Sequence, residues 1–493
     1  MNPSLLAVLV ALPLVAGFLL PLFPLPLRRL VGPLALLAVV VIALGFAGTV
    51  LTAPTVLAVG DFRPPLGIVF YADGAALVFV LAVALLTLLL WPWSDGGSDN
   101  LDRKQSLTLI LAAACIGMAV SGDIFHVYVF YELAAVVCYG LAAGSRTAAG
   151  QMAAFRYLIL GSVGSLLALI GITLVYLAAG TLNLADLARV APTALGGTAG
   201  LAAFLLILLG VGVKAELFLV NTWAPEVYAT AESRVSALFA GLVSKLALLV
   251  LVRLLVLIFP LPAAREAMLV LGMLGVLSGE LAAFRARDVR RMLAWSSIGQ
   301  LGAAFVAFAI PGPAGLAAGL AIALHHLVAK PALFLLAERW GGSLARIRGA
   351  AARSPLAAGI FVLFALSLIG VPPLPGFWAK YLLLTGLAAQ PAGLWWLAGL
   401  VVLLTSVIEA VYFFRVIGTL YGRDGAPAEA AAQTAYATAG SGLLAAVLVV
   451  AGLAAPQLTA PLDAVAAQMA DAAGYIARVL PAPGPTAVAG VAP

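Results

Sequence analysis

The chain has 493 residues, of which 64% are hydrophobic and only 9% are charged, and its mean hydropathy is +1.16. A soluble domain of this length cannot hold so few charged side chains and stay in water, so the chain is an integral membrane protein. Its apolar segments are too long for barrel strands, which indicates an all-α fold. The net charge of +6 comes from arginines in loops, and no aromatic-interleaved basic surface indicates a nucleic-acid partner.

The first apolar run, in MNPSLLAVLVALPLVAG, has no basic residue before it and no clear cleavage site. We therefore expect a retained span rather than a signal peptide. Apolar windows of about 20 residues predict about fourteen membrane-spanning helices, centred near residues 14, 41, 79, 112, 133, 165, 210, 245, 275, 301, 325, 368, 405 and 446. A Pro- and Ala-rich tail follows at 456–493, with a short amphipathic piece at 462–479.

Positive charge supports this count. Seventeen lysines and arginines, Arg146 and Arg423 among them, fall in odd-numbered loops, whereas the even-numbered loops hold three. Because cytoplasmic loops of membrane proteins are enriched in Lys and Arg, we expect the odd loops in the cytoplasm and both termini outside it. The expected location is a bacterial-type inner (plasma) membrane.

Two predicted spans contain helix breakers beside a lysine. In the seventh span, Lys214 precedes N-T-W-A-P, where Pro225 removes a backbone donor and disfavours helix at Ala224. The twelfth segment, SLIGVPPLPGFWAKYLLLTG, carries the breakers Pro372, Pro373, Pro375 and Gly376, followed by Lys380. Helices broken inside a membrane mark cavities and ion sites, although prolines can also simply kink packed helices.

The two broken segments lie five spans apart, which suggests two inverted five-helix repeats, as in many transporters. The predicted divisions are 1–104 with the first three helices, 105–260 with the first repeat, 261–425 with the second repeat, and 426–493 with the last helix and the tail. An odd number of spans per repeat inverts one repeat relative to the other.

Charged residues lie at predicted membrane depth, where each costs about 3 kcal/mol or more on insertion scales. Four of the five lysines fall in spans. The acidic residues in spans or at their ends are Asp73, Glu132, Glu216, Glu280 and Glu409. Nothing about folding requires these groups, so they are candidates for ion translocation.

Glu132 in the fifth span shares a helical face with Tyr128 and Tyr139. In a low-dielectric interior, a Glu–Lys pair can act as a proton switch, because a nearby proton changes which partner is charged. A static ion pair that fixes helix packing is the alternative for Glu132.

Lys245 lies in the eighth span, and the eleventh contains LHHLVAKPALFLLAER. His326 and Lys330 are four residues apart and face the same way. Histidine titrates near neutrality and can pass protons between charged neighbours, although a buried histidine can also be a hydrogen-bonded core residue. His325, Asp73, Glu280 and Glu409 are secondary candidates.

No phosphate-binding glycine loop follows a strand, and neither cysteine has metal-ligand spacing. We therefore predict no cofactor and no metal site, and an ion-translocating subunit rather than an enzyme. A proton path of this kind has to be coupled to an ion gradient or to a redox partner.

Four stretches resemble the antiporter-like membrane subunits shared by Mrp-type cation/proton antiporters, respiratory complex I and membrane-bound hydrogenases. They are KAELFLVNTWAPEVYATAESRVSALFAGLVSKLALLVLVR, FRARDVRRMLAWSSIGQLG, HHLVAKPALFLLA and SLIGVPPLPGFWAKYLL. The H-H-x-x-x-K-x-x-L-F-L and G-x-P-P-x-x-G-F-W-x-K patterns are most similar to the D-type subunits of Mrp complexes.

The resemblance implies two half-channels joined by a buried hydrophilic axis. Carried over by motif, Glu132 and Lys214 form the coupled pair, Lys245 and His326 continue the axis with Lys330 nearby, and Lys380 gates the far exit. The implied partners are other membrane subunits, the lipid bilayer, protons and monovalent cations, with Na⁺ the expected cation.

Some residues depart from the family pattern. Glu216 and Glu226 stand where other residues are usual, and Glu216 is expected to point away from Lys214, towards a subunit contact. Pro331 follows Lys330 directly and is expected to bend the eleventh helix. We expect no long C-terminal amphipathic helix of the kind that the largest complex I antiporter-like subunit carries.

The preferred interpretation is the D-type subunit of a multi-subunit Na⁺/H⁺ antiporter. One alternative is a proton-pumping subunit of a redox complex, such as a complex I-like NADH:quinone oxidoreductase or a membrane-bound hydrogenase. Another is a membrane partner that supplies proton-motive force to a soluble catalytic subunit.

Overall fold

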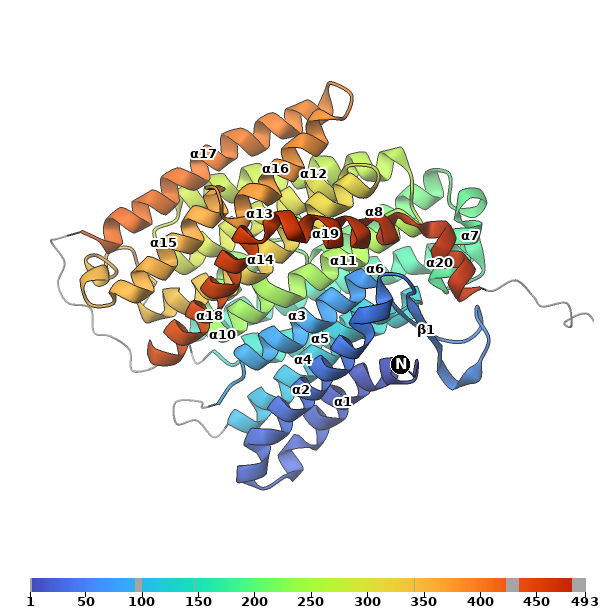
Figure 1. Cartoon of the computed structure of the whole chain (residues 1–493), viewed down its shortest axis with the longest axis horizontal. Helices are drawn as coiled ribbons and strands as arrows, with labels where there is room; N and C mark the ends of the chain where they lie inside the picture. Colours follow the sequence, from blue (N-terminus) through green and yellow to red (C-terminus); the bar gives the residue numbers. More distant parts are fainter. Residues whose placement is uncertain (1, 94–99, 146, 341, 423–433, 481–493) are drawn as a thin grey trace, which may run out of the picture.

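The computed structural model describes residues 2–93, 100–145, 147–340, 342–422 and 434–480, and it consists mainly of long helices packed side by side (Figure 1). Within these ranges, eleven helices are long and apolar enough to cross a membrane, accompanied by the shorter apolar helices Gly74–Leu89, Thr198–Gly212 and Pro355–Ile369. The chain is therefore a multi-pass helical membrane protein, as predicted. Each predicted span centre falls in a different helix, while fourteen crossings stay a prediction.

The N-terminal region consists of α1 (Leu5–Leu19), η1 (Leu20–Leu22), α2 (Leu25–Val50), β1 (Thr55–Ala58), η2 (Val59–Asp61), β2 (Val69–Ala72) and α3 (Gly74–Leu89). The strands form an antiparallel hairpin in which Thr55 pairs with Ala72. This hairpin was not predicted, because four-residue strands are too short to show a clear alternating pattern. Asp73 begins α3, since its Oδ1 accepts a hydrogen bond from the Ala76 amide at 2.7 Å.

The part of the chain predicted as the first repeat contains α4 (Leu101–Val120), α5 (Ile124–Ala142), α6 (Ala148–Ala179), α7 (Leu184–Ala194), α8 (Thr198–Gly212), α9 (Ala224–Thr230), α10 (Ser233–Leu238), the π-helical turn η3 (Phe239–Val243) and α11 (Ser244–Leu257). From α10 to α11 the chain follows one buried apolar path of 25 residues, Ser233–Leu257. The predicted break in the seventh span is the gap between α8 and α9.

The position of this break corrects the sequence prediction. The helix ends at Gly212, and Pro225 lies in the first turn of α9, where a missing backbone donor costs nothing. The intervening chain includes Glu216 (φ +57°) and Leu219 (φ +83°) in the left-handed region. Pro225 therefore starts the second half of the broken helix and does not end the first.

The second predicted repeat contains α12 (Pro262–Arg285), α13 (Val289–Ala309), α14 (Pro313–Arg339), η4 (Ala350–Ala352), α15 (Pro355–Ile369), α16 (Pro375–Ala388) and α17 (Leu394–Leu420). The predicted break is present between α15 and α16. Gly370 ends α15 at φ +97°, and Pro375 begins α16. Pro331 lies inside α14, which is assigned as one helix from Pro313 to Arg339.

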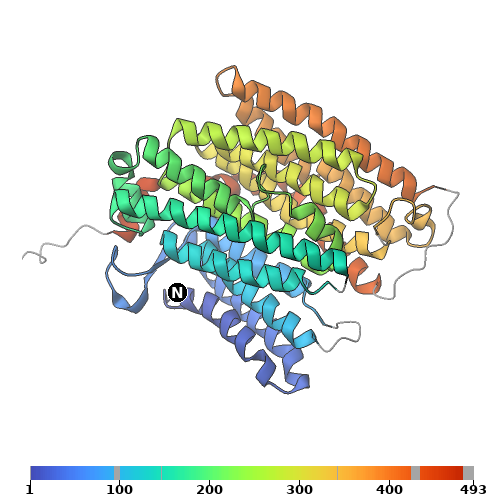
Figure 2. The ribbon, with the colours of Figure 1, turned by 180° about the vertical axis from the view of Figure 1, so that it is seen from behind.

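The C-terminal region consists of α18 (Thr434–Leu453), α19 (Ala455–Ala470) and α20 (Ala472–Val479). The predicted amphipathic piece at 462–479 falls in α19 and α20, which cross the front of the bundle in Figure 1 and lie behind it in Figure 2. Gln468 holds α19 in place. Its Oε1 accepts a hydrogen bond from the Gly74 amide at 2.6 Å, and its Nε2 donates to the Val50 carbonyl at 2.9 Å.

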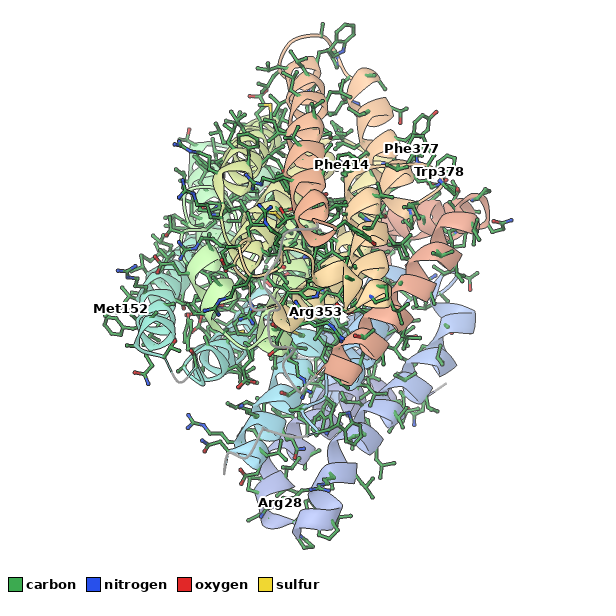
Figure 3. The ribbon with its side chains drawn as sticks, turned by 90° about the vertical axis from the view of Figure 1, so that its left-hand side faces the viewer. Arg28, Met152, Arg353, Phe377, Trp378 and Phe414 are labelled. Carbon is green, nitrogen blue, oxygen red and sulfur yellow. The ribbon has the colours of Figure 1, made fainter. Side chains whose placement is uncertain are left out.

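Apolar side chains cover the outside of the bundle. Met152 and Trp378, which are labelled on opposite sides in Figure 3, are 52% and 38% exposed. Such side chains suit a lipid or subunit environment, whereas four lysines lie in the interior or partly buried. Arg146, Arg423 and the predicted division at 425 lie outside the described residues.

Candidate functional site

The break between α8 and α9 exposes backbone groups that the interior has to satisfy. The Trp223 indole Nε1 donates to the Val213 carbonyl at 2.8 Å, and the Asn221 amide donates to the Glu216 carbonyl at 3.4 Å. Trp223 is itself fixed by stacking on Tyr157, with ring centroids 3.9 Å apart. These side chains hold open the non-helical segment that contains Lys214.

Lys214 is 1% exposed and points at aromatic rings of α5. Its Nζ lies 4.1 Å from the centroid of the Tyr131 ring and 5.6 Å from that of Tyr139. Cation–π attraction of this kind favours the charged amine. No hydrogen-bond partner for Nζ lies within the described residues.

Glu132, on the same helix α5, has a buried Oε1 that also finds no hydrogen-bond partner in the described chain. Its predicted pairing with Lys214 is not a direct ion pair here, since no contact within 4.0 Å joins them, although their charges attract one another. Tyr128, on the predicted face of Glu132, hydrogen-bonds Ser165 at 2.9 Å. Glu132 and Lys214 therefore attract one another without forming a direct ion pair.

Lys245 is fully buried at the start of α11. Its Nζ donates to the Ala240 carbonyl, which belongs to the π-helical turn η3, and to Ser244 Oγ at 3.1 Å. A π-turn widens the helix and changes the partners of its carbonyls, which is common at functional sites. The turn thus supplies an acceptor for a lysine that the sequence pattern places in an apolar helix.

Glu216 was expected at a subunit contact, and this expectation was wrong. The side chain is 1% exposed, and its Oε1 accepts a hydrogen bond from the Tyr228 hydroxyl at 2.6 Å. Lys245 and Lys330 attract its carboxylate. The spacing argument assumed a helix through Lys214, but the chain has already unwound, so the two side chains need not diverge as they would on a helix.

Lys330 and the two histidines come from α14. The Lys330 Nζ donates to Ser296 Oγ at 2.7 Å and to the Leu293 carbonyl at 3.2 Å. His325 Nε2 contacts Ser367 Oγ at 2.9 Å, at the end of α15. His326 is 1% exposed, and neither of its ring nitrogens has a partner among the described residues.

Lys380, at the second break, is held by three oxygens. Its Nζ donates to Glu409 Oε2 at 2.7 Å, to Ser406 Oγ at 3.1 Å and to the Ile369 carbonyl at 3.1 Å. Ile369 ends α15, so one acceptor is a carbonyl that the broken helix has released. Glu409 also accepts from the Gln300 side chain at 2.8 Å.

Two further predicted acids lie in different places. Glu280 accepts a hydrogen bond from the Tyr412 hydroxyl at 2.8 Å, and its charge acts together with that of Glu409 on Lys330. Asp73 instead pairs with Arg253 at 2.6 Å while capping α3. Asp73 therefore has a structural task at the end of a helix, and sequence reasoning did not anticipate Arg253 as its partner.

The described residues thus place buried or partly buried lysines and carboxylates on or directly beside helices α5, α8, α11, α12, α14, α16 and α17. No group of three or more His, Cys, Asp or Glu side chains in the described ranges is arranged to hold a metal ion. Ionisable groups with hydroxyls and carbonyls between them can carry protons by changing partners. This fold and this site define an antiporter-like membrane protein.

Comparison with known proteins supports this classification as an antiporter-like membrane protein. Residues 121–408 match the family of the NADH:quinone oxidoreductase/Mrp antiporter membrane region, and the chain belongs to this family. It is 34% identical over 383 residues to the N-type subunit of the NADH-quinone oxidoreductase of Desulforudis audaxviator, covering 74% of each chain. It is 29% identical over 381 residues to the D-type subunit of the Na⁺/H⁺ antiporter of Bacillus subtilis, covering 75% of this chain and 76% of that protein.

Solved structures give the same result. A chain of the membrane-bound sulfane sulfur reductase, an archaeal respiratory membrane complex, matches with a TM-score of 0.89 and 30% identity, over 97% of this chain and all (100%) of that chain. A chain of the Mrp complex from Dietzia sp. matches with a TM-score of 0.87 and 25% identity over the same shares, 97% and 100%. The matched chains are components of multi-subunit membrane assemblies.

Proposed function

We propose that this chain is the proton-translocating D-type component of a multi-subunit Na⁺/H⁺ antiporter. The observation that carries the proposal is the set of four lysines inside the bundle, each with a carboxylate in electrostatic reach: Lys214 with Glu132, Lys245 with Glu216, Lys330 with Glu280, and Lys380 with Glu409. Burying this many charges is costly, and intramembrane ionisable groups usually serve ion movement.

The proposed mechanism is charge switching. Protonation near Glu132 weakens its attraction for Lys214, and the changed charge on Lys214 perturbs Lys245. The perturbation then reaches His326, Lys330 and the Lys380–Glu409 pair. The two breaks in α8/α9 and α15/α16 supply the hydrated ends of this path.

The proposal includes the arrangement in the membrane. Two inverted five-helix repeats, at 105–260 and 261–425, would form the two half-channels, beside helices 1–104 and the segment 426–493. Both termini would lie outside the cytoplasm of a bacterial-type inner membrane, since basic residues gather in the opposite loops. Other membrane subunits would flank the chain and complete the exchanger.

The test uses the native complex carrying a tagged copy of this chain, reconstituted in liposomes with a pH-sensitive dye. Addition of Na⁺ should drive proton movement in the wild type, and Lys214→Ala should abolish it while the complex still assembles. Arg63→Ala is a matched control, because Arg63 is an exposed basic residue of an even-numbered loop. Unchanged transport by Lys214→Ala would contradict the mechanism, and a variant that fails to insert would make Lys214 structural.

A second candidate function is a proton-pumping component of a redox complex. It is favoured by the 34% identity to the N-type subunit of an NADH-quinone oxidoreductase and by the match to a respiratory membrane complex. Electron-transfer chemistry would then lie on other subunits, so the site in this chain would be the same. Mass spectrometry of the gently solubilised complex distinguishes the two, since small Mrp-type subunits indicate the antiporter and iron–sulfur or hydrogenase-like subunits indicate the pump.

A further inference from the structure

Glu216 is the buried carboxylate that the sequence interpretation assigned to the outside of the protein. It lies in the unwound segment between α8 and α9 with φ +57° and is 1% exposed. Its two oxygens are used differently. Oε1 accepts the Tyr228 hydroxyl at 2.6 Å, whereas Oε2 is buried and has no hydrogen-bond partner in the described part of the chain.

The groups around Glu216 come from four elements. Tyr228 belongs to α9, Lys245 to α11 and Lys330 to α14, and both lysines attract the carboxylate. Ser297 on α13 is close enough to act on the carboxylate, although its buried Oγ makes no hydrogen bond of normal geometry within the described residues. The carboxylate is therefore within electrostatic reach of Lys245 from the first predicted repeat and of Lys330 from the second.

His326 adds to this centre from α14. Both of its ring nitrogens are buried and unpartnered within the described ranges, and it lies in the electrostatic reach of Lys245 and Lys330. Buried polar atoms without hydrogen-bond partners in the described residues therefore lie on Glu216 and on His326, which share the neighbours Lys245 and Lys330, and such atoms provide positions where a proton or a bridging water can be held.

We propose that Glu216 carries the proton between the two half-channels. The inference rests on the proposed function and gives Glu216 a defined step in it. The Lys245 ammonium loses a proton as an O–H bond forms at Glu216 Oε2, which leaves a neutral amine and a carboxylic acid. The acid then protonates the neutral Lys330 amine, directly or through His326, and returns to the carboxylate. Tyr228 holds Oε1 throughout, so that Oε2 faces the exchange.

The competing explanation is a static carboxylate that anchors the unwound segment to α11 and α14. Both explanations require a negative charge, so loss of transport in Glu216→Gln alone does not separate them. They differ in protonation, because a static carboxylate stays ionised during turnover. Infrared difference spectroscopy of the working complex therefore supplies the deciding signal, the C=O stretch of a protonated carboxylic acid.

The experiment compares the wild type, Glu216→Gln, Glu216→Asp and the control Glu226→Gln in reconstituted complexes. Glu226 is an exposed carboxylate of the same region, paired with Arg156 at 2.8 Å, so its variant should behave as wild type. Glu216→Gln should slow proton translocation by about 100-fold, as loss of a proton-transferring group does, and Glu216→Asp should restore most of it. A carboxylic acid band should appear in the wild type, vanish in Glu216→Gln and shift in Glu216→Asp.

Wild-type rates in Glu216→Gln, or a band unaffected by either substitution, would overturn the inference and leave the proposed function intact. If Glu216→Gln does not assemble, the band shift in Glu216→Asp still distinguishes a proton-carrying Glu216 from a static carboxylate. Wild-type complexes that move no protons would overturn the proposed function itself.

Discussion

The two broken helices carry the same kind of lysine in opposite situations. Lys214 faces two aromatic rings and finds no hydrogen-bond partner in the described residues, whereas Lys380 is held by a carboxylate, a hydroxyl and a released carbonyl. The first lysine has no hydrogen bond to break when it moves, whereas the second cannot move without leaving the buried Glu409 carboxylate without its cation. On the proposed path, the Lys214 end is therefore open, without a hydrogen-bond partner in the described residues, and the Lys380 end is closed by an ion pair.

The backbones of the two breaks differ as well. The second break turns at Gly370, which adopts φ +97° without steric cost, and restarts at Pro375. The first break places Glu216 and Leu219 in the left-handed region, which costs about 1–3 kcal/mol for each such residue. The first break is therefore the strained one, and Trp223 and Asn221 hold it in place.

The largest loss of stability should come from breaking the Lys380–Glu409 ion pair. Lys380→Met leaves Glu409 as a buried carboxylate without its cation and should lower stability by about 3–5 kcal/mol. Lys214→Met breaks no such pair and should leave stability unchanged or higher. Thermal unfolding of the two purified variants in detergent measures the difference.

The double variant Lys380→Met/Glu409→Gln is the control, because it removes both charges and should recover most of the lost stability. Equal destabilisation by Lys214→Met and Lys380→Met would show that the open and closed ends do not differ energetically.

A smaller loss of stability should follow from removing the hydrogen bond between Trp223 and the Val213 carbonyl at the first break. Trp223→Phe keeps an aromatic ring to stack on Tyr157 but leaves the Val213 carbonyl without its donor, at a cost of about 1–3 kcal/mol. Proteolysis and thermal unfolding measure the loss. Trp396→Phe is a matched control, since its indole is 58% exposed and donates at the surface. Identical stability of the two variants would mean that Trp223 does not hold the break.

The smallest effects, of about 1 kcal/mol each, should have opposite signs at the two breaks. Leu219→Gly relieves a left-handed leucine whose side chain is 62% exposed, and should stabilise the protein. Gly370→Ala places a Cβ at φ +97° and 3.2 Å from the Lys380 Cδ, and should destabilise it. Chemical denaturation of both variants reports the signs, and the same sign in both would contradict the assigned conformations.

Much of the fold was predictable because membrane-spanning helices appear in the sequence as long apolar windows. The centres of the spans, the break before Lys380 and the amphipathic C-terminal piece all follow from local composition. The break after Lys214 was predicted in the right span but at Pro225, because proline was taken to end a helix when it begins one. The β1–β2 hairpin is too short to leave a pattern.

The candidate site was predictable as a set of residues and less so as a set of contacts. Lys245, Lys330, Lys380 and Glu409 are conspicuous because charge is rare in this chain, and the structure buries or partly buries all of them. The direction of Glu216 was missed because helical spacing does not apply to an unwound segment. A glutamate two residues after a membrane lysine, in a span with a predicted break, was the available signal.

Gln468 also has a consequence for the order of folding. Its side chain hydrogen-bonds Val50, the last residue of α2, and Gly74, the first residue of α3, which lie 418 and 394 residues earlier in the chain. Because a protein is synthesised from its N-terminus, α3 enters the membrane long before its partner exists. The first amide of α3 is therefore satisfied only when α19 arrives, and the last helices to be made complete the first ones.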